Sequence, residues 1–293
     1  MTNNNAHFER NRKLVESALL VAIATVLSMV KLVELPYGGS ITLASMLPIV
    51  LIAYRSGILW GLGSGFVYGV IQQLLGLKNL SYFTTWQSIL AIILLDYLVA
   101  FAALGLGGVF RKALNRQSYA LVAGSVVGCA VRYICHVISG ATVWAGLSIP
   151  SGAAIGYSLI YNATYMLPET IILALLAFYL GELIDFRVER PARLTESALS
   201  KKGDVVTILA SVIALGALIF DVASIFGHMQ NAESGEFDIT GLAVHGPFVK
   251  SFWLSVIVVT AVALAVVCTL IVLRKTAFRE ESSERNIADG SDK

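Results

Sequence analysis

Residues 86–109 read WQSILAIILLDYLVAFAALGLGGV, and Asp96 is the single charged side chain in that stretch. About 20 consecutive apolar residues are enough for a helix to cross the hydrocarbon core of a bilayer. A carboxylate in the middle of such a helix costs several kcal/mol unless it has a partner, so it is a functional-site hypothesis by default. The stretch therefore predicts a membrane helix that carries a site at Asp96.

The whole chain has the composition of an integral membrane protein. Its 293 residues are 57% hydrophobic and only 14% charged, with a mean hydropathy of +0.77. A soluble domain is about 45–50% apolar and about 25% charged. The formal net charge is only +2, and we expect no nucleic-acid partner. The three cysteines lack CxxC spacing and no His, Cys or carboxylate cluster has metal-ligand spacing, so we expect no metal and no cofactor.

Apolar runs predict about eight membrane spans. Six runs are long enough on their own, namely 14–33, 86–109, 118–141, 154–184, 205–227 and 251–273. The apolar region 41–76 is interrupted at 54–57, and we divide it there into two shorter helices. Lys and Arg gather before the first span, in alternate connections and after the last span. This charge pattern predicts a multi-pass protein of the cell membrane with both termini in the cytoplasm.

The expected organisation is all-α and polytopic, with a six-helix core and two additional C-terminal transmembrane helices. The predicted parts are a cytoplasmic N-terminal tail (1–13), the core (14–184), a cytoplasmic linker (185–203), the two-helix addition (204–275) and a polar cytoplasmic tail (276–293). No internal repeat indicates the inverted halves found in many secondary transporters.

Several polar and aromatic residues lie in or beside the apolar runs, and they are the candidate site. They are Asp96, Tyr97, Arg132, His136, Trp144, Tyr157 and Asn162. Aromatic rings around an acidic group suit a flat, cationic, hydrogen-bonding ligand. A structural salt bridge between Asp96 and Arg132 is the alternative for the acid, and an interfacial aromatic belt is the alternative for Trp144. Glu169 and Asp221 are further intramembrane acids to which the sequence assigns no role.

Small residues mark positions where helices can approach closely. Ala18 and Ala22 lie four residues apart on one face of the first span, facing either another helix of this chain or a partner. Packing within the chain is the favoured interpretation before any resemblance is considered. A longer series, Gly57, Gly61, Gly65 and Gly69, predicts tight packing of the third span.

Over about residues 14–184 the chain resembles the ThiT family, the thiamin-specific substrate-binding (S) components of energy-coupling-factor (ECF) vitamin transporters. Ala18 and Ala22 match the alanine motif of that family's first helix, and residues 95–100 (LDYLVA) resemble its EYLVAP stretch. Residues 132–136 (RYICH), followed by Gly140 and Trp144, resemble its K-Y-x-x-H…G…W run. Residues 156–159 (GYSL), followed by Asn162, resemble its A-Y-S-L-x-x-N motif.

The resemblance implies a site and partners. It implies that the vitamin site is lined by Asp96, Tyr97, His136, Trp144, Tyr157 and Asn162, with Tyr37 of the first loop replacing a family tryptophan. It also implies that Ala18 and Ala22 contact a transmembrane coupling subunit, which works with ATPase subunits in the lipid bilayer. The expected function is capture of thiamin, or a related pyrimidine or thiazole compound, for import.

Two other functions are open at this level. An ion-coupled secondary transporter of a small cationic metabolite would use the intramembrane carboxylates to handle protons. An intramembrane enzyme would use Asp96 and His136 as an acid–base pair, but no nucleophile or metal motif accompanies them, so we do not expect an enzyme. The chain also lacks a GxxxxGK[ST] phosphate loop, so ATP hydrolysis by that route would have to come from a partner.

Overall fold

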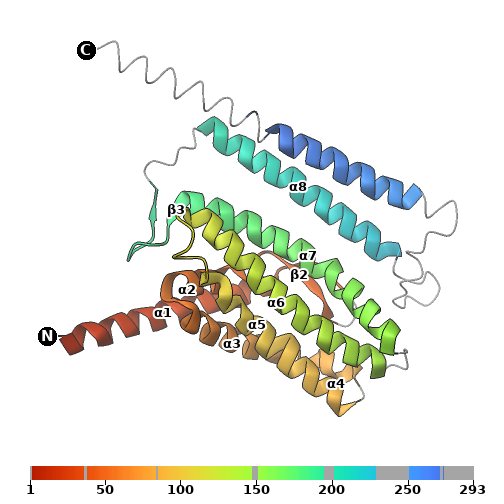
Figure 1. Cartoon of the computed structure of the whole chain (residues 1–293), viewed down its shortest axis with the longest axis horizontal. Coiled ribbons are helices and arrows are strands. Elements are labelled where there is room, and N and C mark those ends of the chain that lie inside the picture. Colours follow the sequence, from red (N-terminus) through yellow and green to blue (C-terminus); the bar gives the residue numbers. More distant parts are fainter. Residues whose placement is uncertain are drawn as a thin grey trace, which may run out of the picture. The chain divides into compact units, whose positions relative to one another are not determined.

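The computed structural model describes residues 2–35, 38–83, 85–146, 151–194, 201–228, 251–270 and 273. The chain forms two compact units, Met1–Leu194 (unit 1) and Thr195–Lys293 (unit 2). Each unit is described by itself. The all-helical, polytopic fold class predicted from the sequence is confirmed, because long helices dominate both units (Figure 1).

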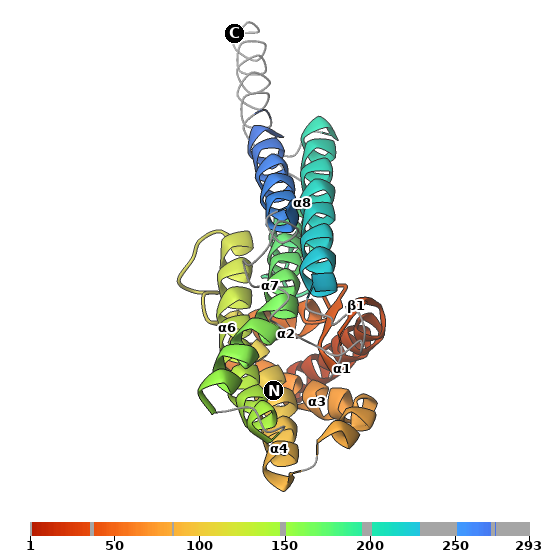
Figure 2. The same cartoon turned by 90° about the vertical axis from the view of Figure 1, so that its right-hand side faces the viewer.

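Unit 1 is a helical bundle with two short antiparallel strand pairs, β1–β2 and β3–β4. Its elements are α1 (Thr2–Met29), β1 (Lys31–Glu34), β2 (Ser40–Thr42), α2 (Leu47–Ser56), α3 (Ile58–Leu75), η2 (Leu77–Tyr82), α4 (Trp86–Ala91), η3 (Ile92–Val99), α5 (Ala100–Ala102), η4 (Ala103–Gly108), α6 (Gln117–Gly146), α7 (Ser151–Leu183), β3 (Ile184–Asp185) and β4 (Ala192–Arg193). The long helices α6 and α7 lie side by side in both views (Figures 1 and 2).

Six helices in the described part of the chain are long and apolar enough to cross a membrane: Ile58–Leu75, Trp86–Gly108, Gln117–Val143, Ala154–Leu183, Ile208–Ile225 and Ser251–Leu270. Two of the eight expected spans are absent from this set. Helix α1 falls short in apolar character, and α2 has only 10 residues. At 1.5 Å per residue α2 is about 15 Å long, half the thickness of the hydrocarbon core. Its residues from Leu47 to Tyr54 are buried, so α2 is apolar because protein surrounds it.

The first expected span, 14–33, ends early. Helix α1 stops at Met29, and β1 then pairs antiparallel with β2, with Glu34 opposite Ser40 and Lys31 opposite Thr42. Lys31 Nζ donates to Glu34 Oε1 over 2.6 Å and holds the pKa of that exposed carboxyl below its ordinary value. The prediction of helix through residue 33 is therefore wrong, because pairing with the following strand outweighs the local apolar pattern.

The glycine series on α3 packs as the sequence predicts, with one exception. A Cβ at Gly61 would lie 2.4 Å from Cβ of Ala53, one at Gly65 would lie 2.4 Å from the carbonyl oxygen of Phe101, and one at Gly69 would lie 2.6 Å from that of Tyr97. Gly57 instead joins α2 to α3 with φ of 100°, a left-handed conformation that glycine adopts without strain. Helix α3 therefore lies directly against the helix that carries Asp96.

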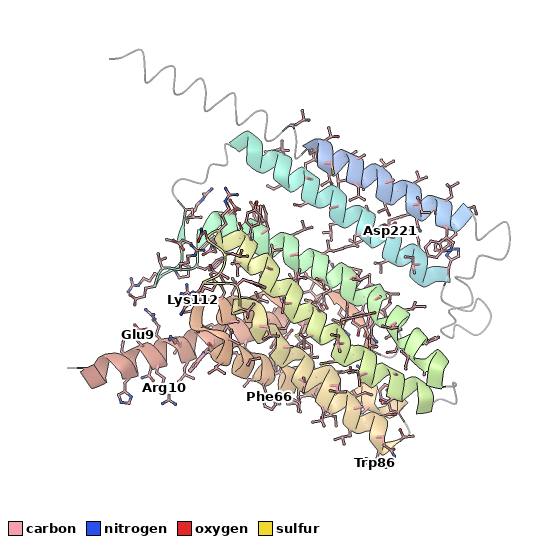
Figure 3. The ribbon with its side chains drawn as sticks, in the orientation of Figure 1. Glu9, Arg10, Phe66, Trp86, Lys112 and Asp221 are labelled. Atoms are coloured by element: carbon pink, nitrogen blue, oxygen red, sulfur yellow. The ribbon has the colours of Figure 1, made fainter. Side chains whose placement is uncertain are left out.

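Basic connections gather at one end of unit 1. Glu9, Arg10 and Lys112 lie at that end and Trp86 at the opposite end (Figure 3). Arg55, in the last turn of α2, forms an ion pair with Glu16 of α1 and donates to the carbonyl oxygens of Phe186, Val188 and Glu189. Arg111 Nη1 donates to the carbonyl oxygen of Arg55 over 2.6 Å, and Arg187 Nε donates to the hydroxyl of Tyr54 over 3.1 Å. The loops that the charge pattern assigns to one membrane side thus lie together.

Unit 2 contains α8 (Lys201–His228) and the helix Ser251–Leu270. The Thr260 hydroxyl donates to Asp221 Oδ2 over 2.6 Å, and the ring of His228 stacks on that of Phe252 with centroids 3.8 Å apart. Because the residue numbers rise on one helix as they fall on the other, these contacts define an antiparallel helix pair.

Candidate ligand-binding cavity

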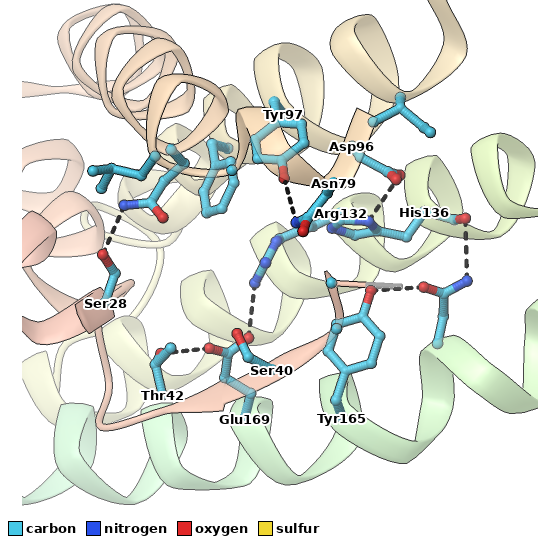
Figure 4. Close-up of a pocket in the computed structure, with 18 of the residues that line it drawn as sticks. Ser28, Ser40, Thr42, Asn79, Asp96, Tyr97, Arg132, His136, Tyr165 and Glu169 are labelled. Atoms are coloured by element: carbon cyan, nitrogen blue, oxygen red, sulfur yellow. Dashed lines mark hydrogen bonds and ion pairs between the residues drawn. The ribbon is translucent and has the colours of Figure 1, made fainter. Parts of the chain in front are cut away.

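A cavity of about 380 Å³ lies inside unit 1. Side chains from α1, the β1–β2 hairpin, α3, η3, α6 and α7 line it (Figure 4). Ligand sites of small molecules are typically about 300–1,000 Å³, mostly apolar, with a few placed polar groups. Polar groups here include Thr42, Gln72, Asn79, Asp96, Tyr97, Arg132, His136, Tyr161, Asn162, Tyr165 and Glu169. The size and the polar content both suit one small organic ligand.

Asp96 and His136 form the acidic centre of the cavity. His136 Nδ1 lies 2.8 Å from Asp96 Oδ1, and the Ser139 hydroxyl donates to the same oxygen. A neutral His136 that donates from Nδ1 has Nε2 left as an acceptor. Nε2 is buried and has no hydrogen-bond partner among the described residues. An unpaired nitrogen on a buried ring that lines a cavity is the feature that a polar ligand would satisfy.

The backbone around Asp96 departs from a regular α-helix. Residues Ile92–Val99 form a π-helix, which continues through a turn of α-helix into the 3-10 segment Ala103–Gly108. A π segment widens the helix, and such segments frequently occur at functional sites. Here it carries two successive residues, Asp96 and Tyr97, that both line the cavity. The Tyr97 hydroxyl accepts a long 3.5 Å hydrogen bond from Asn79 Nδ2.

Arg132 pairs with Glu169 and not with Asp96, so Arg132 is the wrong partner for Asp96 in the predicted structural alternative. Arg132 Nη1 donates to Glu169 Oε2 over 2.9 Å, and both side chains are buried. The Thr42 hydroxyl of β2 donates to the other carboxylate oxygen, Oε1, over 2.6 Å. The guanidinium also lies 4.6 Å from the centre of the Phe101 ring. Glu169, which the sequence leaves without a role, is therefore a structural centre of the cavity wall.

Asn162 holds its neighbours in place. Its Nδ2 donates to the carbonyl oxygens of His136 and Ser158 over 3.1 and 2.9 Å, and its Oδ1 accepts from the Tyr165 hydroxyl over 2.7 Å. Both amide hydrogens of Asn162 thus have acceptors within the protein, so no ligand is needed to supply one. Asn162 lines the cavity and fixes the backbone of His136 and the ring of Tyr165.

The other predicted site residues have different positions. Tyr157 is buried in α7 and is not among the described residues that line the cavity. The backbone of Trp144 belongs to the last turns of α6 and does not follow the helix, and its side chain lies outside what the structure describes. Tyr37 lies outside the described residues altogether.

Ala18 and Ala22 lie on the exposed face of α1, whereas Ser17, Val21 and Ala24 face inward. Within the described part of unit 1 these two alanines do not pack against another helix, because the inward face of α1 is offset from them by one position.

Sequence reasoning also missed cavity residues. Tyr161 and Tyr165 recur four residues apart on α7, a spacing that usually indicates helix packing, yet both line the cavity. Glu169 lies seven residues after Asn162, two helical turns along the same face, and that spacing was the signal for it. No sequence signal pointed to Thr42. Within the described residues no group of three or more His, Cys, Asp or Glu could hold a metal ion.

The charges of the cavity favour a cation. Asp96 and Glu169 supply two negative charges, Arg132 supplies one positive charge, and a neutral His136 supplies none. Lys31, which also lines the cavity, is neutralised by Glu34. For a neutral His136 one negative charge is left over, whereas a protonated His136 would balance it within the Asp96–His136 pair. A ligand with one positive charge would neutralise the charge that a neutral His136 leaves.

Comparisons with known proteins agree with this description. Residues 14–185 match the family model described as Thiamine transporter protein (Thia_YuaJ). Thiamine transporter ThiT of Bacillus subtilis (strain 168) is 38% identical over 175 residues, which are 56% of this chain and 86% of that protein. Thiamine transporter ThiT of Lacticaseibacillus paracasei is 30% identical over 176 residues, covering 54% and 81%.

A solved structure of ThiT from Listeria monocytogenes matches with a TM-score of 0.49 and 24% identity, over 59% of this chain and 95% of that one. The family model covers more than half of the present chain, and the chain covers more than two thirds of both curated relatives. This multi-pass membrane protein therefore belongs to the thiamine transporter protein family, whose members are transporters and not enzymes.

Proposed function

We propose that this chain captures thiamin, or a closely related pyrimidine or thiazole compound, in the cavity around Asp96. The observation that carries the proposal is the Asp96–His136 pair with its unpartnered Nε2, in a cavity lined by two acids and by aromatic rings. Two ThiT relatives named as thiamine transporters support the choice of ligand.

The chemistry of thiamin fits these groups. Thiamin has a permanently cationic thiazolium ring, an aminopyrimidine and a hydroxyethyl arm. Asp96 balances the cation, and His136 Nε2 accepts a hydrogen bond from the exocyclic amine. Aromatic rings stabilise a cation by about 0.5–2 kcal/mol each. Tyr97 supplies such a ring in the cavity, and we assign Trp144 the same role.

We assign supporting roles to the remaining predicted residues. Asn162 positions His136 through the hydrogen bond to its carbonyl oxygen. Tyr157, buried behind the cavity wall on α7, supports the helix that carries Asn162. On the basis of the resemblance we assign Tyr37, which follows β1 in the sequence, a contact with the ligand.

We further propose that the chain is the substrate-binding subunit of an ECF-type importer. Ala18 and Ala22 are exposed on α1 among large exposed apolar side chains, including Leu19 (62% exposed) and Val26 (62% exposed). Small residues on such a face let a partner helix approach closely. The partner is a transmembrane coupling subunit that acts with ATPase subunits, because this chain has no phosphate loop of its own.

The topology follows from the charge distribution. We propose that both termini are cytoplasmic, with 1–13, 185–203 and 276–293 on that side of the cell membrane. The gathering of Arg55, Arg111 and Arg187 at one end of unit 1 supports this orientation. The core of residues 14–184 binds the ligand, and residues 204–275 form the two-helix addition.

A matched pair of variants tests the binding site. Asp96→Asn removes one of the two negative charges of the cavity, whereas Asp221→Asn removes a membrane carboxylate from unit 2. We expect Asp96→Asn to weaken thiamin binding at least about 100-fold, as expected when a charged hydrogen bond worth about 1.5–3 kcal/mol and the charge balance are both lost. Asp221→Asn should bind like the unaltered protein. Equal affinity in all three proteins would refute the site.

The ion-coupled transporter receives less support. Glu169, one of its required proton-handling acids, is bound to Arg132 and Thr42 through its two oxygens. That mechanism predicts that vesicles containing this chain alone take up the ligand. It also predicts that this uptake stops when the proton gradient is collapsed. Such uptake would replace the ECF proposal.

A further inference from the structure

The carboxylate of Asp96 is held by two donors from one face of α6. His136 Nδ1 lies 2.8 Å from Asp96 Oδ1, and the Ser139 hydroxyl donates to the same oxygen. Figure 4 shows the side chains of Asp96 and His136 directed at each other. None of the described residues donates to the second oxygen, Oδ2. Because Asp96 lines the cavity and its side chain is 24% exposed, Oδ2 is the oxygen left for a ligand.

Ser139 itself lies behind the cavity wall. It is 0% exposed and is not among the described residues that line the cavity. Its hydroxyl has one hydrogen and two acceptors within reach, Asp96 Oδ1 and the carbonyl oxygen of His136 at 3.3 Å. A hydrogen bond to an ionised acceptor is roughly twice as strong as one between neutral groups, so the carboxylate receives it. Ser139 therefore acts on Asp96 and not on the ligand.

Further hydrogen bonds fix the backbone that carries Ser139. The Thr142 hydroxyl donates to the carbonyl oxygen of Ser139 over 2.6 Å, and the Ser88 hydroxyl of α4 donates to that of Thr142 over 3.3 Å. These two bonds join α4 to α6 within one turn of Ser139. The Ser139 hydroxyl is thus a fixed donor against which the Asp96 side chain is placed.

We propose that Ser139 is a positioning residue of the ligand site, which fixes the Asp96 carboxylate so that Oδ2 and His136 Nε2 accept from the ligand together. The proposal rests on the proposed function, since thiamin is the ligand that meets both acceptors. The terminal torsion of an aspartate is broad and roughly two-fold, so the His136 hydrogen bond alone leaves the carboxylate free to rotate. Two donors on Oδ1 remove this freedom before the ligand arrives, and such preorganisation increases affinity.

Ser139→Ala tests this role, with Ser125→Ala as the matched control. Both changes remove a hydroxyl from a fully buried position of α6, but the Ser125 hydroxyl has no hydrogen-bond partner among the described residues. The assay is an equilibrium titration of the purified, full-length proteins with thiamin. A misplacement of about 1 Å can cost on the order of 100-fold, and we expect the freed carboxylate to weaken thiamin binding about tenfold in Ser139→Ala. Ser125→Ala should bind thiamin like the unaltered protein.

The Asp96→Ala background separates positioning from packing. If Ser139 acts through Asp96, adding Ser139→Ala to Asp96→Ala should change thiamin affinity less than about twofold, because the two residues form one coupled pair. A serine that only packs α6 against η3 would cost the same factor in both backgrounds. The double-mutant cycle therefore gives a coupling that a structural role would not give.

A second pair of variants separates loss of the hydroxyl from change of shape. Threonine keeps the hydroxyl and valine replaces it with a methyl group of similar size, so both share any strain at this buried position. Ser139→Thr should bind thiamin about tenfold more tightly than Ser139→Val, as expected for a hydrogen bond to a charged group. Equal thiamin affinity of these two variants would overturn the positioning role.

The outcomes separate this inference from the proposed function. Failure of the unaltered protein to bind thiamin would overturn the proposed function and the role of Ser139 with it. Tight binding by the unaltered protein and equally tight binding by Ser139→Ala would overturn the role of Ser139 alone. A loss in Ser139→Ala that is just as large in the Asp96→Ala background would also overturn it.

Discussion

A single methyl group on α3 should damage the ligand site without touching the ligand. Gly69 lies against the backbone of the π-helix, and a Cβ at this position would lie 2.6 Å from the Tyr97 carbonyl oxygen and 3.2 Å from Phe101 Cβ. Gly69→Ala therefore forces this backbone to move. Gly63→Ala is the matched control on the same helix, because a Cβ there meets no described atom within 4 Å.

The size of the effect follows from the geometry. Ordinary contact begins at 3.4 Å, so the Tyr97 carbonyl must retreat by about 0.8 Å, the difference between 3.4 and 2.6 Å. Binding groups generally need placement within about 0.5 Å, and Asp96 precedes Tyr97 in the same π segment. Overpacking of this kind costs about 1–3 kcal/mol of folding stability. The displacement of Asp96 and Tyr97 should in addition weaken thiamin binding by roughly 10- to 100-fold, since a misplacement of about 1 Å can cost on the order of 100-fold.

The assay is a fluorescence titration of the two purified variants with thiamin, beside thermal unfolding in the same detergent. We expect Gly69→Ala to bind thiamin at least tenfold more weakly and to unfold at a lower temperature. Gly63→Ala should bind normally and lose no stability, since alanine favours helix by up to about 1 kcal/mol over glycine. Normal thiamin affinity in Gly69→Ala would refute the inference that α3 sets the position of Asp96 and Tyr97.

Three further predictions address other parts of the molecule. Glu169→Ala should destabilise the protein by about 3–5 kcal/mol because it leaves Arg132 buried without a partner, and the double variant Glu169→Leu/Arg132→Met should regain most of that loss in thermal unfolding. Ala18→Trp should leave thiamin affinity unchanged and abolish co-purification with a coupling subunit, whereas retained co-purification would exclude the α1 face. Trp144→Ala should weaken thiamin binding and remove the ligand-induced change in tryptophan fluorescence, and a persisting change would assign the signal to another tryptophan.

The long spans could be predicted from the sequence because lipid burial is a local property of composition. The run 86–109 corresponds to Trp86–Gly108, and 154–184 corresponds to Ala154–Leu183. Composition alone could not distinguish α2 from a membrane-spanning helix, since burial by protein and burial by lipid select the same apolar residues. The hairpin was missed because β1 forms through pairing with β2 and not through a local pattern.

The site was predicted in part, for a related reason. Intramembrane polar residues are costly wherever they lie, so Asp96, His136 and Asn162 could be identified without any structure. Their partners depend on helix rotation, which the π segment around Asp96 alters. The contact of Thr42 with Glu169 joins residues 127 positions apart, and no periodicity within one helix encodes such a pair.

The central claim is that the cavity around Asp96 binds thiamin. The most direct measurement is an equilibrium titration of the purified, full-length protein with thiamin, followed by intrinsic tryptophan fluorescence and compared with hydroxymethylpyrimidine as a fragment of the same vitamin. The account predicts saturable binding of thiamin at sub-micromolar concentration and weaker binding of the fragment, which lacks the thiazolium cation. No response to thiamin, with or without a response to the fragment, would contradict it.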